Sequence, residues 1–424
     1  MFLTLLKKEC VQYLKSITYY IFLIALVLYF ISQMGTFDAK KKPEPGGDDY
    51  GMTRSADKDL IMKDALNGLL SEYDRGEYIT YPIGFYKRVT LNDEEQEQVK
   101  DILLSITGLT EQELKDAYEQ CEKEAEQVRE KAASENRPIM ESEFAPMDVA
   151  IKEGLTWEEF SGKMQTLDDL LGGGSDYSKS NLEYTKVPMT YEQALDAYES
   201  LLKDDKVTNA YARLFCDYMG IVLAILPIFL AVTRALKDRK AQAEQVLFMS
   251  RAGSAKIILS RYLAAVIVTV VPVILCSCST LMQSVYYARS MHAEYDPLAF
   301  IKHIGFWLLP VILVSLSVGF FLTELTDSAI AILVQAVWWF FSIFVNGMNL
   351  VGSVEWNLVP RFNTVGSFEI YRHMEEQLMK NRLLYTGIAL VLILFTVIVY
   401  NKKRKGEFVS VGTVLRNRKN KLEA

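Results

Sequence analysis

The stretch Arg234–Arg261, RALKDRKAQAEQVLFMSRAGSAKIILSR, decides how the rest of the chain is interpreted. Seven of its residues are basic, and only Asp238 and Glu244 are acidic. Strongly apolar runs lie on both sides, Tyr218–Thr233 before it and Tyr262–Ala288 after it. Because basic loops between membrane-spanning segments remain in the cytoplasm, we expect this stretch to be a cytoplasmic loop.

Apolar runs at four further places give the chain its predicted fold class. A helix needs about 20 apolar residues to cross about 30 Å of hydrocarbon. The sequence predicts an α-helical polytopic membrane protein with six transmembrane helices and a mainly helical extracytoplasmic domain. The predicted crossings are residues 16–36, 211–233, 259–288, 301–323, 327–348 and 383–401.

Charge is divided unequally along the chain. Residues 38–206 hold 21 Lys and Arg against 39 Asp and Glu, a net charge of −18, and the remaining residues carry a net charge of +11. The basic excess lies beside the first crossing, in the loop at 234–258 and in the tail at 402–424. The positive-inside rule therefore predicts a multi-pass protein of a bacterial cell membrane with both termini in the cytoplasm.

Polar segments complete the predicted organisation. Residues 1–15 have helical apolar spacing and suit an amphipathic helix at the membrane surface, or a plain basic flank of the first crossing. Residues 37–210 read as the helical extracytoplasmic domain, with Tyr78–Val89 as a short strand or hairpin. A second external segment, 349–382, contains a candidate amphipathic helix. Capping boxes predict helix starts in the large domain at Asn92, Thr110, Thr156 and Thr190.

Motifs of covalent chemistry are absent from the sequence. There is no GxxxxGK[ST] loop, since Gly162-Lys163 is followed by Met164, and there is no HExxH, GxSxG or GxGxxG. The three histidines are scattered, and the five cysteines have no metal-ligand spacing. We therefore predict no catalytic residue, no metal site, no cofactor bound by this chain and no nucleic-acid partner.

Residue order inside the basic loop resembles the permeases of the ABC-2 exporter class. The resemblance is carried by EQVLFMS at Glu244–Ser250 and by RAGSAKIILSRYLA, which follows it. Six crossings, an amphipathic first helix and a basic tail agree, so the resemblance covers about half of the chain. Members often have Pro after the Ser, where this chain has Arg251.

The resemblance implies that the chain is a permease subunit without its own ATP site. It implies a separate ABC ATPase dimer that binds ATP and Mg, and a second permease copy or a homologous permease as partner. The segment 234–258 would then couple the two proteins. Its implied contact residues are Glu244, Gln245, Leu247, Phe248, Ser250 and Arg251. The alternative for this loop is a basic amphipathic segment lying on anionic lipid.

Polar residues inside predicted crossings mark either a transport path or hydrogen bonds between helices. Gln283, Gln335 and Asn346 are the candidates for the path. Glu324 and Asp327 fall in a short turn, where Asp327 is expected to cap the fifth crossing.

Two functions from different classes follow from these patterns. The first is the permease subunit of an ATP-driven exporter, which couples ATP hydrolysis in a partner to substrate export. The alternative is a membrane-anchored sensor whose extracytoplasmic domain recognises a peptide or envelope ligand. The sequence leaves open the transported substrate and the role of the large domain. It also leaves open whether the permease pairs with a second copy of itself or with a different permease.

Overall fold

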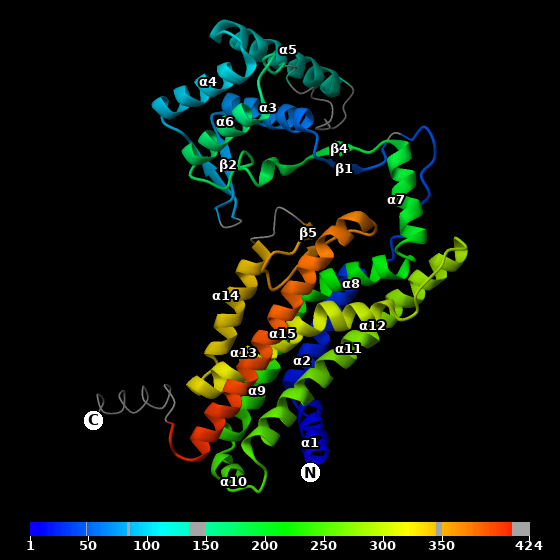
Figure 1. Ribbon diagram of the computed structural model, residues 1–424, viewed down its shortest axis with the longest axis vertical. Coiled ribbons are helices and arrows are strands. Elements are labelled where there is room, and N and C mark those ends of the chain that lie inside the picture. The colour runs from blue at the N-terminus through cyan, green and yellow to red at the C-terminus, as the bar shows by residue number, and fades with distance from the viewer. Residues whose placement is uncertain (48, 83–84, 135–146, 148, 345–349, 409–424) are drawn as a thin grey trace. The chain divides into compact units, whose positions relative to one another are not determined.

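The computed structural model of the protein describes residues 1–47, 49–82, 85–134, 147, 149–344 and 350–408. The chain divides into two compact units (Figure 1). One, here called the membrane unit after its apolar helices, comprises Met1–Pro45 and Glu192–Ala424. The other, the polar unit, comprises Gly46–Tyr191.

The membrane unit is built almost entirely of helices, with one small antiparallel strand pair. Its elements are α1 (Phe2–Leu14), α2 (Ile17–Met34), α7 (Tyr191–Lys203), α8 (Thr208–Leu223), α9 (Leu226–Lys240), α10 (Glu244–Phe248), α11 (Ser254–Ser290), α12 (Ala299–His303), the π-helical turn η4 (Ile304–Leu308), α13 (Leu309–Thr326), α14 (Ile330–Phe344), β5 (Val351–Ser353), β6 (Arg361–Phe362) and α15 (Phe368–Arg404).

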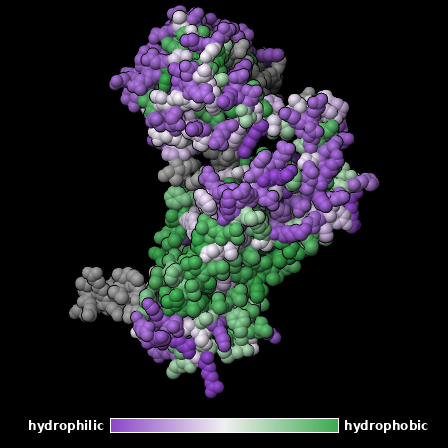
Figure 2. Space-filling model, in the orientation of Figure 1, coloured by the Kyte–Doolittle hydropathy of each residue, from purple (hydrophilic) through white to green (hydrophobic). Residues whose placement is uncertain are grey.

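Four helical stretches of the described residues are long and apolar enough to cross a membrane: α2, α11, the run from α12 to α13, and α15. The bent pair α8 and α9 makes a fifth if the two helices count as one span. Figure 2 shows hydrophobic residues covering the middle of the membrane unit, with hydrophilic residues at the end that carries α10. The chain is therefore an α-helical, membrane-embedded protein, and its six-crossing topology stays a prediction.

Several element bounds differ from the expected ones. α15 is a continuous helix of 37 residues that joins the expected external helix to the sixth crossing. No proline or cap interrupts its helical pattern at the expected boundary, Arg382, so the helix continues. α11 begins at Ser254, earlier than expected. Residues from Glu192 onward belong to the membrane unit, although we expected the polar domain to extend to residue 210.

α13 is the central helix of the membrane unit, where it contacts α9, α11, α14 and α15. Its close approach to α9 depends on Gly319. A Cβ at this position would lie 2.6 Å from the Cβ of Ala231, so a larger residue would push the helices apart. Small residues at such crossings bring helix backbones together, and van der Waals packing then holds them within lipid.

The polar unit has a hydrophobic core of its own. Its elements are β1 (Met52–Ser55), α3 (Lys58–Arg75), β2 (Tyr78–Thr80), β3 (Lys87–Val89), α4 (Asp93–Thr107), α5 (Glu111–Ser134), α6 (Trp157–Leu170), the 3-10 turn η3 (Asn181–Glu183) and β4 (Thr185–Pro188). Helices α3, α4 and α6 pack on one another around Leu66, Leu103 and Phe160, which are fully buried. β1 and β4 pair antiparallel near the two ends of the unit.

Local sequence signals determined much of the polar unit. Reciprocal hydrogen bonds of the capping box are present at Asn92, Thr110 and Thr156. The hairpin expected at Tyr78–Val89 is confirmed, since β2 pairs antiparallel with β3. Long-range polar contacts were not expected. Glu72 of α3 accepts hydrogen bonds from Tyr177 Oη (2.6 Å) and from the Ile79 amide, and burial nevertheless raises its pKa.

We predict that residues 46–191 fold without the membrane unit, because their core is separate and β1–β4 pairing closes the segment. The isolated segment should be helical by circular dichroism and unfold cooperatively on heating. Phe160→Ala should lower its stability by about 3–5 kcal/mol, whereas Leu60→Ala, at an exposed site of α3, should cost less than about 1 kcal/mol. A non-cooperative melt would show that the unit depends on the membrane part.

Candidate functional site

A buried ion-pair cluster joins three helices at the end of the membrane unit that carries α10. Arg234 of α9 binds Glu9 of α1 through two parallel hydrogen bonds, of 2.6 and 2.8 Å. Arg234 also lies 3.2 Å from Asp238, one turn further along α9. Arg261 of α11 donates to Asp238 as well, and its Nε lies 3.7 Å from Glu9. Two arginines and two carboxylates thus fix α1, α9 and α11 to one another.

A second cluster connects α9, α13 and α15 close by. Lys403 of α15 is buried and donates to Asp327 (2.6 Å) and Glu324 (3.3 Å). Arg239 of α9 also binds Asp327 at 2.6 Å. Asp327 is the C-cap residue of α13, in the left-handed conformation, and its carboxylate binds these cations. Sequence reasoning gave Asp327 only a capping role at the fifth crossing and did not foresee these cations from α9 and α15.

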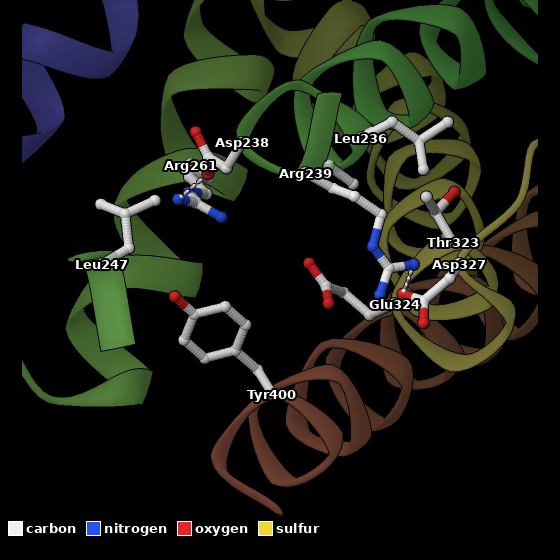
Figure 3. Close-up of a pocket in the computed structure, with 10 residues that line it drawn as sticks. Leu236, Asp238, Arg239, Leu247, Arg261, Thr323, Glu324, Asp327 and Tyr400 are labelled. Atoms are coloured by element: carbon white, nitrogen blue, oxygen red, sulfur yellow. Dashed lines mark hydrogen bonds and ion pairs between the residues drawn. The ribbon is translucent and has the colours of Figure 1, made fainter. Parts of the chain in front are cut away.

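A small cavity lies between the two clusters (Figure 3). Asp238 and Arg261 of the first cluster line it, as do Arg239, Glu324 and Asp327 of the second. Figure 3 shows Glu324 and Tyr400 both pointing into this space, with Leu247 of α10 at its edge. Opposite charges are nearly balanced around the cavity. In the described part of the chain, no group of His, Cys, Asp and Glu is arranged to hold a metal ion.

The basic loop folds as the short helix α10 between α9 and α11. Of the implied coupling residues, Glu244 begins α10, and its side chain lies outside the described part. Gln245 and Arg251 are exposed, whereas Leu247 and Phe248 are half-buried. Ser250 is half-buried as well. The Phe248 ring packs edge-on against Tyr400 of α15, with 5.6 Å between ring centroids. Leu247 and Phe248 therefore face the membrane unit.

Two other apolar residues of the loop face outward. Val246 is 68% exposed and Met249 is 79% exposed. They are three residues apart, so they lie on the same side of the chain as it leaves α10. Arg251, in the following turn, and Lys256, in the first turn of α11, are exposed basic residues beside them in sequence. The exposed surface of the loop is thus an apolar pair accompanied by positive charge.

The three candidate transport-path residues have separate surroundings. Gln335 is buried in α14, and its amide donates to the Ala224 carbonyl at 2.6 Å. Gln283 is half-buried in α11. Asn346 lies outside the described residues. For Gln335, the structure shows the hydrogen bond between helices that was one of the two expected roles.

The bond from Gln335 lies at the break between α8 and α9. The axis bends by 41° between α8 and α9, where Pro227 lacks an amide hydrogen. The break leaves carbonyls at Ile221 and Ala224 without their regular helical partners, and Trp339 of α14 donates to the former at 2.8 Å. Backbone groups at membrane depth need such donors, because lipid supplies none.

Further buried ion pairs occupy the opposite end of the membrane unit. Asp217 of α8 accepts from Arg361 Nε (2.9 Å) and from the Phe362 amide (2.6 Å), which ties the β5–β6 loop to α8. Arg213 makes two hydrogen bonds to Asp205 in the turn before α8. Burial raises the pKa of Asp205, while Arg213 opposes this shift. These pairs join neighbouring elements of the membrane unit.

Comparison with known proteins gave no match to a family model, to a curated protein or to a solved structure.

Sequence reasoning named Asp238, Glu324 and Asp327 but missed the contacts that form the two clusters. It gave Glu9 no role, and it used the basic tail only as a marker of topology. One signal was available: Glu9 is the single acidic residue of Met1–Lys15, on a segment with three lysines. Its partners Arg234 and Arg261 are more than 200 residues away, so no local pattern could identify them.

We predict that Glu9→Gln destabilises the membrane unit, because it leaves Arg234 and Arg261 with one buried carboxylate between them. Removing one partner of a buried ion pair costs about 3–5 kcal/mol. The measurement is thermal unfolding of the detergent-purified chain. Lys8→Gln, at the exposed neighbouring position, is the matched control and should leave the melting temperature unchanged. Equal melting temperatures for the two variants would refute a structural role for the cluster.

We also predict that Gln335→Leu lowers stability by about 1–3 kcal/mol, since the Ala224 carbonyl would lose its donor in an apolar environment. Val334→Ala, at the exposed preceding position, should cost less. If Gln335 instead lines a transport path, Gln335→Leu would change transport while the melting temperature stayed the same.

Proposed function

We propose that this chain is the membrane-spanning permease subunit of an ATP-driven exporter in a bacterial cell membrane. A separate ABC ATPase dimer binds and hydrolyses Mg–ATP, and a second permease copy or a homologous permease completes the transporter. In this arrangement the membrane unit crosses six times, both termini and α10 are cytoplasmic, and the polar unit is extracytoplasmic. The energy comes from the partner, because the sequence contains no phosphate-binding loop.

The observation that carries the proposal is the exposed pair Val246 and Met249 on the α10 loop. Two apolar side chains of this exposure gain free energy when a partner buries them, about 1.5–3 kcal/mol for each full burial. Arg251 and Lys256 beside them favour a partner surface with acidic residues at its rim. A folded protein with an apolar groove and an acidic rim satisfies both requirements.

The position of the loop also supports a coupling role. Immediately beside α10 lie the ion pairs that bind α1, α9, α11, α13 and α15 together. The helices that would rearrange during transport therefore meet at the base of the loop that would receive the ATPase. A change of position at α10 reaches them through contacts of a few ångströms.

The test is co-purification with a co-expressed candidate ABC ATPase, using variants that change the exposed face. Val246→Asp with Met249→Asp should weaken assembly about a hundred-fold, because burial of two apolar side chains is lost. Met52→Asp with Leu60→Asp, at two exposed apolar sites of the polar unit, is the matched control, with assembly retained.

Leu247 and Phe248 serve as a second comparison. Since Phe248 packs on Tyr400, replacing it with Asp should lower thermal stability before it affects docking. Full assembly by the Val246/Met249 double variant would overturn the docking assignment. A wild-type chain that transports or signals without any ATPase would overturn the permease proposal itself.

A further inference from the structure

The last turn of α15 holds the α10 loop through one side chain. The guanidinium of Arg404 donates to three backbone carbonyls: Phe248 O at 2.7 Å, Ala252 O at 2.6 Å and Ser250 O. These carbonyls belong to the end of α10 and to the turn that leads into α11. The last carbonyls of a helix have no partner within it, and Arg404 supplies donors for this part of the chain.

α10 depends on such support because it is only five residues long. A helix of this length is not stable in water without tertiary contacts. Two further contacts connect the same loop to the same turn of α15. The Phe248 ring packs on Tyr400, and Ser254 Oγ lies 3.0 Å from Asn401 Oδ1. Together with Arg404, these contacts bind the loop to one end of α15.

The same turn of α15 is bound to α13 by a different residue. Lys403, directly before Arg404, is buried against Glu324 and Asp327. α15 also packs along α13, which is the central helix of the membrane unit. The same turn of α15 thus contacts the α10 loop through Arg404 and α13 through Lys403.

We infer that Arg404 is a positioning residue that makes the α10 loop and the end of α15 move as one body. Displacement of the loop is then delivered to α15 and, through Lys403, to α13, in addition to the two helices that flank the loop in sequence. The direction of this transmission rests on the proposed function, whereas the clamp itself is a property of this chain. Arginine suits the role because its planar group presents five donors in a fixed fork.

The first experiment uses the purified full chain without any partner. Hydrogen exchange of the amides in residues 245–253 is measured in wild type, Arg404→Gln and Arg404→Lys. Arg404→Gln should raise exchange there about ten-fold, since bonds to three carbonyls are lost, while α13 stays protected. Arg404→Lys should restore part of the protection. Lys405→Gln, at an exposed neighbouring position, should match wild type.

The second experiment adds the same candidate ABC ATPase. Arg404→Gln should bind the ATPase within about three-fold of wild type, because Val246 and Met249 remain exposed, but should lose most of the increase in ATPase rate that the wild-type chain produces. Arg404→Lys should recover part of that rate. If Arg404→Gln merely misfolds, assembly and ATPase stimulation fall together and the α13 amides exchange faster. In that case Arg404→Lys tests the clamp, because it should keep the fold and recover part of the protection and of the rate.

The outcomes test the Arg404 clamp and the proposed function separately. Unchanged exchange in Arg404→Gln overturns the clamp. Faster exchange with full ATPase stimulation overturns transmission through α15 and leaves the flanking helices as the route. If the wild-type chain binds no ATPase, the proposed function fails, and the exchange measurement still decides whether Arg404 holds the loop.

Discussion

The ion pair between Glu9 and Arg234 is the interaction on which the arrangement of the membrane unit depends. It joins α1 to α9, and Arg261 connects α11 to the same pair. Charges removed from water are costly unless each has a close partner. The four charged groups are Glu9, Arg234, Asp238 and Arg261. Only a few relative positions of α1, α9 and α11 give each of them a close partner of opposite charge.

The same constraint explains the polar contacts deeper in the unit. The break between α8 and α9 leaves the carbonyls of Ile221 and Ala224 without helical partners. Trp339 and Gln335 of α14 donate hydrogen bonds to them, which lipid could not do. The break therefore determines where α14 packs, as the ion pairs determine where α1 packs. Polar residues in these helices act first as connections between elements. A role in transport has to be compatible with those connections.

The position of the ion pairs gives the α10 loop its significance. A short exposed loop on a loosely packed base would absorb a displacement without passing it on. Here the loop adjoins charged contacts among five helices, and it is bonded to α15 by Arg404. Packed helices change position in discrete steps, because side chains that interlock do not deform continuously. A loop joined to them at its base can therefore bias which arrangement they adopt.

The sequence by itself determined the apolar helices, the separate polar unit, several helix starts and the location of the exposed basic loop. These depend on local signals: runs of apolar residues, capping boxes at Asn92 and Thr156, and a change in charge along the chain. The bend at Pro227 also had a local signal, although the sequence analysis did not use it. The apolar runs and the capping boxes each lie within about 20 residues, the length of a helix that crosses a membrane.

Only the tertiary structure decided which face of the loop is outward and which charges meet. The resemblance implied Leu247 and Phe248 as partner contacts; in the structure both are half-buried and Phe248 packs on Tyr400, whereas Val246 and Met249 are exposed. Glu9 with Arg234, and Arg404 with Phe248, are separated by 225 and 156 positions in the chain. Their contact follows from how whole helices pack, and packing depends on the shape and charge of every neighbouring element at once.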